Sequence, residues 1–180
     1  ITTEACAAYY ENGGKLPEGL MDQVREAMVS TEEDMDRGFG RSEKPLLVSV
    51  RSGARVSMPG MMDSILNLGL NRDTLHGLAM SSQSERFAYD ANRRFIMMFS
   101  DVVLGVSRAE FEKIFDAHKK RAGVDLDTRV TAAGLQEISN QFLVIHQKIS
   151  KTTASARAVI KRILLENGEN HRTNRTIENV

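Results

Sequence analysis

The sequence predicts a helix-rich α+β fold, and three observations support this. Apolar residues recur at spacings of three and four over several long segments, as on the buried face of a helix. Only Leu46–Val50 and Ile65–Leu70 are short apolar runs of strand type, and the second fits a turn equally well. A chain of 180 residues is long enough to bury a sizeable core, as one domain or as a domain with an appendage.

The first quarter of the chain predicts two helices followed by a loop. The first is expected to run from Thr2 or Thr3 through Tyr10, where a pair of glycines ends it. The second carries an apolar face made of Leu20, Met21, Val24, Ala27 and Met28. Residues 30–44 are expected to be mostly loop: Ser30–Glu33 has the form of a capping box, but two nearby glycines prevent a long helix.

The second half predicts four helices. A short helix is expected over Asp73–Met80. A long one follows, with a single apolar stripe made of Phe87, Ala91, Phe95, Met98, Phe99 and Val102. A third opens at the capping-box pattern Ser107–Glu110 and ends at Gly123. Thr131 caps a fourth, whose apolar face is formed by Leu135, Ile138, Phe142, Ile145 and Ile149.

Composition narrows the class of function. Lys plus Arg and Asp plus Glu both number 24, and this balance argues against a dedicated binder of nucleic acid or membrane surfaces. No apolar run approaches the roughly 18 residues of a membrane span. A single cysteine, Cys6, allows no intrachain disulfide and fits a reducing compartment. No Cys or His spacing of metal-binding type is present, so no metal-ligating residue is expected.

The segment Leu46–Asp63 is the most informative for function. A short strand delivers Arg51 into a stretch rich in Gly, Ser and Met, where Gly60 allows the backbone to approach a ligand closely. Arg51 and Arg55 offer planar, permanently charged groups to phosphate oxygens. The pattern therefore indicates an anion or phosphate site, and an ordinary salt bridge beside a glycine turn remains the alternative.

The run Pro45–Asn71 resembles the amino-terminal nucleotide-binding domain of the pyruvate, phosphate dikinase family, which has an ATP-grasp architecture. The resemblance extends from Ile1 to about Lys148, with further matching stretches at Ile1–Tyr10, Glu85–Asp90, Arg93–Phe95 and Asp101–Val103. It implies a partial ATP-grasp-type domain over residues 1–149. Residues 150–180 are expected to be a divergent tail, first helical and then disordered.

The resemblance also implies a function. The domain is expected to bind Mg-ATP and to pass phosphate to a histidine on another domain, which then phosphorylates pyruvate. Arg51 matches the nucleotide-phosphate arginine of the family, and Gly60 and Met62 match its loop over the ATP phosphates. Arg55 is expected as a second cation there, or as a partner of Asp63. No catalytic residue is expected in this chain, because the phosphate lysine, the Mg²⁺ ligands and the phosphoacceptor histidine of the family belong to other segments.

Several further expectations follow. The chain begins at Ile1 and not at Met, so it is expected to be a fragment carrying half a nucleotide site, inactive alone. The full-length enzyme is expected to be a homodimer in the cytoplasm or in an organelle. The alternative function for this chain is that of a non-catalytic remnant or a regulatory or interaction module. Arg93 and Arg94 are expected on a solvated or salt-bridged helix face. Four histidines are expected to be ordinary surface or helix-face residues: His76, His118, His146 and His171.

Overall fold

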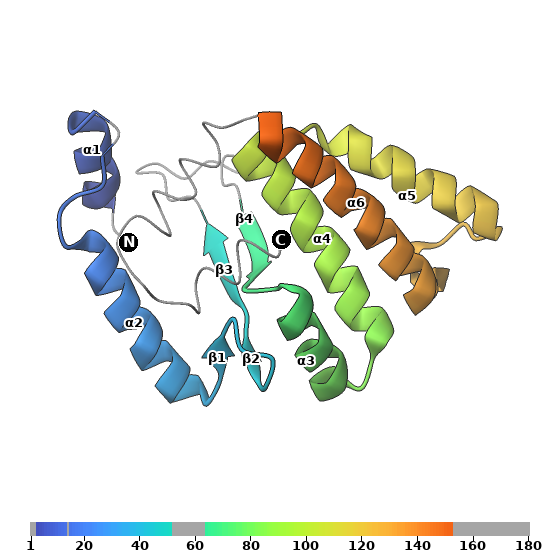
Figure 1. Ribbon diagram of the computed structural model, residues 1–180, viewed down its shortest axis with the longest axis horizontal. Coiled ribbons are helices and arrows are strands. Elements are labelled where there is room, and N and C mark those ends of the chain that lie inside the picture. Colours follow the sequence, from blue (N-terminus) through green and yellow to red (C-terminus); the bar gives the residue numbers. More distant parts are fainter. Residues whose placement is uncertain (1–2, 14, 52–63, 153–180) are drawn as a thin grey trace.

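The computed structural model describes the backbone of residues 3–13, 15–51 and 64–152, in which helices surround a small region of strands (Figure 1). The elements in chain order are α1 (Thr3–Glu11), α2 (Leu20–Met35), β1 (Gly38–Phe39), β2 (Pro45–Leu46), β3 (Val48–Arg51), β4 (Ser64–Leu68), α3 (Arg72–Ser82), α4 (Glu85–Leu104), α5 (Arg108–Ala122), a 3-10 turn (Asp127–Arg129) and α6 (Ala132–Thr152). This content agrees with the predicted helix-rich α+β class. Residues 153–180, where the divergent tail is predicted, lie outside the described residues.

The predicted helices of the second half are confirmed, and local chemistry explains where they begin and end. Asn71 caps α3: its Oδ1 accepts hydrogen bonds from the backbone N–H groups of Asp73 at 2.9 Å and Thr74 at 2.8 Å. The Thr131 hydroxyl accepts from the N–H of Gly134 at 3.2 Å at the start of α6, as predicted. Gly123 ends α5 with φ of 65°, a conformation in which other residues are strained.

The region 30–44 differs from its prediction as a loop. Helix α2 continues to Met35, so the supposed capping box at Ser30–Glu33 lies inside the helix, where the Thr31 hydroxyl donates to the carbonyl of Ala27 at 2.7 Å. Helix α2 has no buried residue, and polar side chains are therefore tolerated all along it. The glycines lie beyond the helix end and do not shorten it. The second predicted capping box is also wrong, because Ser107 precedes α5 without a side-chain capping bond.

The described residues form four strands, where the sequence predicted two at most. β1 pairs with β2 in parallel, through Gly38 with Pro45, and β3 pairs with β4 in antiparallel orientation. The predicted single strand Leu46–Val50 is divided between β2 and β3. Of the two alternatives for Ile65–Leu70, the strand is confirmed by β4.

Helix α4 is the centre of the core, because apolar clusters lie on two of its sides. The cluster toward α5 and α6 consists of Ile96, Met97, Val106, Phe111, Phe115, Val130, Leu135, Ile138 and Phe142. The cluster toward α3 and the β3–β4 pair consists of Leu70, Ala91, Phe95 and Phe99, with partly buried Leu47, Ile65, Leu68 and Leu78 among the residues packed on it. Because α4 is covered on two sides, its buried residues do not follow the predicted single stripe. Two members of that stripe are exposed, Phe87 to 53% and Val102 to 39%.

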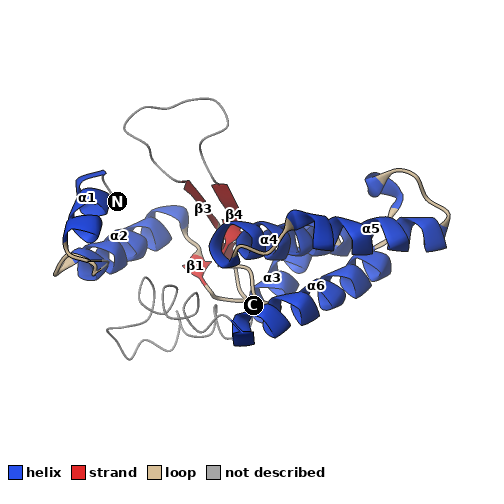
Figure 2. Ribbon diagram, turned by 90° about the horizontal axis from the view of Figure 1, so that it is seen from above, coloured by secondary structure: helices blue, strands red, loops and turns tan. Residues whose placement is uncertain are grey.

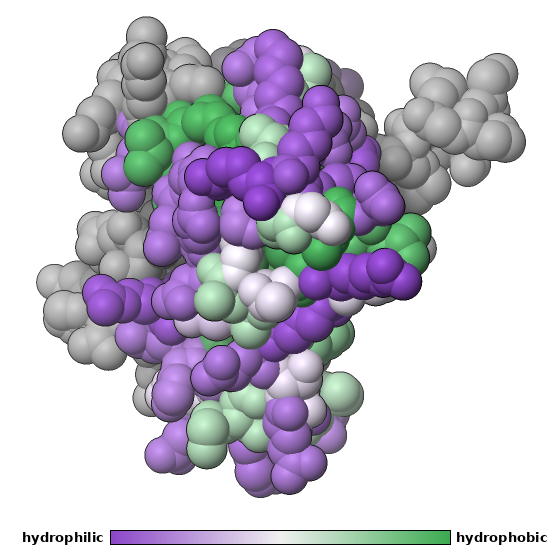
Figure 3. Space-filling model, turned by 90° about the vertical axis from the view of Figure 1, so that its right-hand side faces the viewer, coloured by the Kyte–Doolittle hydropathy of each residue, from purple (hydrophilic) through white to green (hydrophobic). Residues whose placement is uncertain are grey.

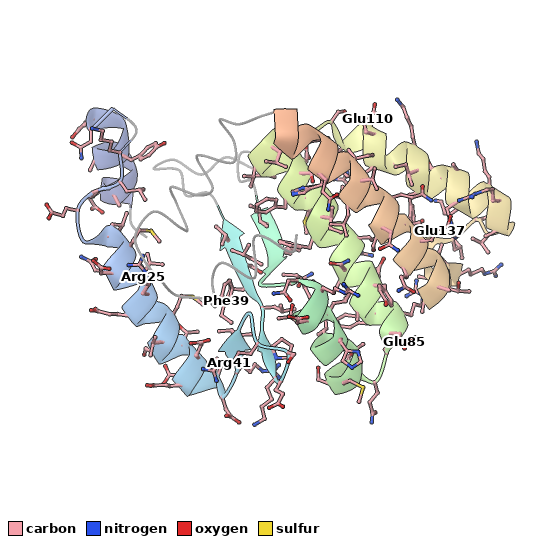
Figure 4. The ribbon with its side chains drawn as sticks, in the orientation of Figure 1. Arg25, Phe39, Arg41, Glu85, Glu110 and Glu137 are labelled. Carbon is pink, nitrogen blue, oxygen red and sulfur yellow. The ribbon has the colours of Figure 1, made fainter. Side chains whose placement is uncertain are left out.

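The outer surface of α5 and α6 is largely polar. Figure 3 shows this end of the molecule as mostly hydrophilic, with apolar side chains in separate patches. Exposed ion pairs lie on it, including Lys113 with Glu110 at 3.1 Å and Arg121 with Glu137 at 3.0 Å; Figure 4 labels both glutamates. Pairs of this kind contribute little to stability, so the fold depends on the two apolar clusters.

Candidate functional site

The predicted phosphate-binding segment leaves and rejoins the β3–β4 pair at one end. Arg51 is the last residue of β3, and its Cα is paired with that of Ser64, the first residue of β4. The strand therefore delivers the Arg51 backbone to the start of residues 52–63, as the sequence predicts. The Arg51 side chain, together with Arg55, Gly60 and Met62, lies outside the described residues.

One face of the β3–β4 pair is fixed to α4. Ile65 and Leu68 of β4 pack against the cluster that contains Phe95 and Phe99. Figure 2 shows both strands beside α4. Because the strands are held by a packed helix, the position at which Arg51 enters the segment is set by the core.

Two apolar side chains of the β3–β4 pair are partly exposed among the described residues. Val50 is 45% exposed and Leu66 is 40% exposed. Exposed apolar side chains on a two-stranded pair are common at surfaces that contact another segment or protein. Val50 directly precedes Arg51, so exposed apolar surface lies next to the end of this strand.

Arg93 is a buried cation in a salt bridge. Of the two helix faces predicted for it, the salt-bridged one is confirmed and the solvated one is wrong. Its residue is 6% exposed, its Nη2 lies 2.8 Å from Asp90 Oδ1, and its guanidinium carbon lies 4.1 Å from the centre of the Phe115 ring. Burial lowers the pKa of Arg93, and the Asp90 carboxylate opposes this shift. Arg94 is exposed and also pairs with Asp90, at 3.0 Å. The contact of Arg93 with Phe115 joins α4 to α5.

His146 is also buried: it lies on a face of α6, as one alternative of its prediction has it, and the surface alternative is wrong. It is 8% exposed, its Nδ1 lies 3.0 Å from the Ser100 hydroxyl oxygen, and its ring packs 6.0 Å from that of Phe99. Burial lowers the pKa of the imidazole and favours its neutral form. The sequence signal was available, because His146 lies four residues after Phe142 on the buried face of α6. The pair is shielded from solvent and joins two helices.

The other described histidines match their predictions. His76 is exposed on α3, and His118 has its Nδ1 3.6 Å from a Glu137 carboxylate oxygen. His171 lies outside the described residues. Within residues 3–13, 15–51 and 64–152, no group of three or more His, Cys, Asp or Glu side chains is arranged to hold a metal ion. No helix in that part of the chain combines the length and apolar character needed to cross a bilayer.

No family model matches the chain, but individual known proteins are similar to it in sequence. The pyruvate, phosphate dikinase of Clostridium symbiosum is 51% identical over 148 residues, which cover 82% of this chain and 17% of that protein. The chloroplastic pyruvate, phosphate dikinase of Mesembryanthemum crystallinum is 48% identical over 149 residues, covering 83% of this chain and 16% of that protein. Chloroplastic pyruvate, phosphate dikinase 1 of Arabidopsis thaliana is 49% identical over 146 residues, covering 81% and 15%.

These identities are far above the level at which sequence similarity arises by chance over such lengths. The chain spans only 15% to 17% of the length of these relatives. About four fifths of this chain is therefore related in sequence to one segment of the pyruvate, phosphate dikinases.

Proposed function

We propose that this chain is part of the ATP-binding domain, of ATP-grasp architecture, of a pyruvate, phosphate dikinase. The observation that carries the proposal is an identity of 46% to 51% over about four fifths of the chain with several proteins of that name. The position of Arg51 at the end of a strand held by α4 supports it. The parent enzyme would interconvert ATP, phosphate and pyruvate with AMP, diphosphate and phosphoenolpyruvate through a phosphohistidine on another domain.

The chemistry assigned to this chain is recognition of the nucleotide phosphates. Phosphoryl transfer requires mainly positioning and neutralisation of developing charge. In the proposal, the guanidinium of Arg51 bridges phosphate oxygens, since it remains charged at any physiological pH. Backbone N–H groups of Gly60 and Met62 hold further oxygens, and Arg55 provides a second cation at the same site.

The magnesium ion that accompanies ATP is assigned to another segment of the parent protein. The described residues contain no cluster of acidic side chains that fits it. The phosphate lysine and the phosphoacceptor histidine are likewise assigned elsewhere. This chain alone would then present half a nucleotide site, within a parent enzyme proposed to be a homodimer in the cytoplasm or in an organelle such as a plastid.

The proposal is tested with Arg51→Ala in the full-length parent enzyme. Phosphorylation of its histidine is measured separately with labelled ATP and with labelled phosphoenolpyruvate. The ATP-dependent rate is expected to fall at least about a hundredfold, the loss typical of removing one transition-state donor, and the other rate is expected to stay unchanged. Arg108→Ala is the matched control, because Arg108 is exposed on α5 and pairs only with Glu112, at 2.9 Å, among the described residues. An equal fall in both rates would remove Arg51 from the ATP site.

The half-site interpretation is tested with the 180-residue chain itself. Calorimetric titration with Mg-ATP is expected to give weak or undetectable binding, because most of the charge-neutralising groups are assigned to other segments. Micromolar or tighter binding by this chain would contradict that division of the site. It would also favour an independent module over a segment of an enzyme.

A further inference from the structure

Strand β4 contains one residue more than β3 between two cross-strand pairs. The first pair joins Val48 to Leu68, and the second joins Val50 to Ile65. A single residue lies between these pairs on β3, whereas two residues lie between them on β4. This arrangement is a β-bulge, which bends the longer strand and increases its local twist. Bulges occur often beside active sites, where they redirect a side chain or end the pairing.

The extra residue allows two side chains of β4 to reach the same apolar cluster. Ile65 and Leu68 both pack against the cluster between α4 and the strands, and Figure 1 shows β4 as the strand nearer to α4. Leu66, between them, is 40% exposed. Side chains of a regular strand alternate between its two faces, so residues three positions apart would face in opposite directions. The bulge therefore keeps both residues in the core.

Asn67 provides the backbone conformation of the bulge. Its φ is 60°, in the left-handed region that is strained for most residues but accessible to glycine and asparagine. Among the five residues of β4, only Asn67 has a positive φ. Its carbonyl oxygen accepts a hydrogen bond from the N–H of Leu70 at 3.2 Å, so the chain turns directly after the bulge. Because a regular strand needs a negative φ here, the residue type at position 67 influences whether β4 is bulged or regular.

The bulge decides which residue of β4 lies opposite the backbone of Arg51. In the structure this residue is Ser64. If β4 continued from the Val48–Leu68 pair as a regular strand, Arg51 would lie opposite Ile65 instead. A change of register by one residue moves the side chains of a strand to its other face, so Ile65 would leave the core. The position at which Arg51 enters the following segment would change with it.

We propose that Asn67 is a positioning residue for Arg51. Its left-handed conformation holds the bulge of β4, and the bulge sets the register at the end of β3. Asn67 acts through the pairing of the two strands and not by contact with the nucleotide. The effect on phosphate recognition rests on the role proposed above for Arg51. The effect on strand register does not depend on that role, so the two parts are tested separately.

The register is tested by nuclear magnetic resonance on the isotopically labelled 180-residue chain. Asn67→Gly keeps the left-handed conformation accessible, whereas the β-branched side chain of Asn67→Val disfavours it strongly. Nuclear Overhauser effects between backbone protons of Arg51 and Ser64 are expected in the wild type and in Asn67→Gly. In Asn67→Val they should be replaced by effects between Arg51 and Ile65. Unchanged Arg51–Ser64 effects in Asn67→Val overturn the proposal, and Asn67→Ala gives the same comparison if Asn67→Val does not fold.

The effect on function is measured in the full-length parent enzyme, as phosphorylation of its histidine by ATP and by phosphoenolpyruvate. In Asn67→Val the ATP-dependent rate should fall at least about tenfold, because misplacing a reacting group's partner by about 1 Å can cost about a hundredfold. The phosphoenolpyruvate-dependent rate should stay unchanged, and Asn67→Gly should keep both rates.

Gln83→Val is the matched control for strain. Gln83 also has a positive φ, of 52°, but it lies at the exposed end of α3, so Gln83→Val should lose stability and keep the ATP-dependent rate. Equal falls of that rate in Asn67→Val and Gln83→Val would reduce the role of Asn67 to stability and overturn the proposal. A wild-type rate in Asn67→Val, with a loss in Arg51→Ala, overturns the positioning role alone. A wild-type rate in Arg51→Ala instead contradicts the proposed phosphate site itself.

Discussion

Replacing Phe142 with alanine tests the packing of α6 against α4 and α5. Phe142 is fully buried, and its ring meets that of Phe111 edge-on with centroids 4.9 Å apart. Truncation removes the buried ring, leaves a cavity and breaks the aromatic pair, and we expect it to cost about 3–5 kcal/mol of unfolding free energy. That is a large part of the total stability of a typical domain. Phe142→Leu, which keeps most of the volume, is expected to cost about 1–2 kcal/mol.

The matched control is Phe87→Ala. Phe87 is 53% exposed on α4, so its loss is expected to change stability by less than about 0.5 kcal/mol. The sequence pattern placed both phenylalanines on buried faces, and the structure separates them. Urea unfolding followed by far-ultraviolet circular dichroism measures all three variants, which suits a chain without tryptophan. Equal losses for Phe87→Ala and Phe142→Ala would refute the packing described here, as would a loss below about 1 kcal/mol for Phe142→Ala.

Three further predictions concern stability. Burial lowers the pKa of His146 below its ordinary value of 6.5 in the folded state, so the stability that this residue contributes above about pH 6.5 is lost as the pH falls through the lowered folded-state pKa. The urea concentration at the unfolding midpoint should therefore drop on acidification in the wild type, and drop less in His146→Gln. Equal pH dependence of the midpoint in the two proteins would contradict this prediction. Asp90→Ala leaves the buried Arg93 without its nearest partner and should lower the unfolding free energy by about 3 kcal/mol or more. Glu112→Ala, which breaks the exposed pair with Arg108, should lower it by less than about 0.5 kcal/mol. Similar losses in the two variants would be inconsistent with burial of the Asp90–Arg93 pair. In Gly77→Ala the new Cβ would collide with the backbone carbonyl oxygen of Ser42, so we expect a loss of about 1–3 kcal/mol of unfolding free energy. The gain usual for a glycine-to-alanine change in a helix would argue against this contact.

Long periodic helices were predictable from the sequence, and elements created by tertiary contact were not. The helices α4 and α6 carry apolar spacing over many residues, and Gly123 and Asn71 mark ends that local chemistry alone determines. Strand β1 has two residues and pairs in parallel with β2, so it has no period to detect. The end of α2 was missed because polar residues 30–35 look like a loop, although a helix without buried residues accepts them.

The sequence located the candidate phosphate segment but did not reveal the buried polar groups. Arg51 was recognised because a strand run precedes a glycine-containing stretch, and β3 does end at this residue. Arg93 and His146 were missed as buried residues because burial of a charged or titratable side chain depends on partners from other helices. Phe115 covers the guanidinium, and Ser100 meets the imidazole. No local pattern contains those partners.

The affinity of the full-length parent protein for ATP, measured by calorimetry with Arg51→Ala, tests the central claim most directly. A guanidinium that bridges phosphate oxygens contributes charged hydrogen bonds, so its removal should weaken ATP binding at least about tenfold. Phosphoenolpyruvate binding should stay unchanged, and Arg108→Ala should bind both ligands as the wild type does. Wild-type affinity for ATP in the Arg51→Ala protein would contradict the assignment of this strand end to the nucleotide phosphates.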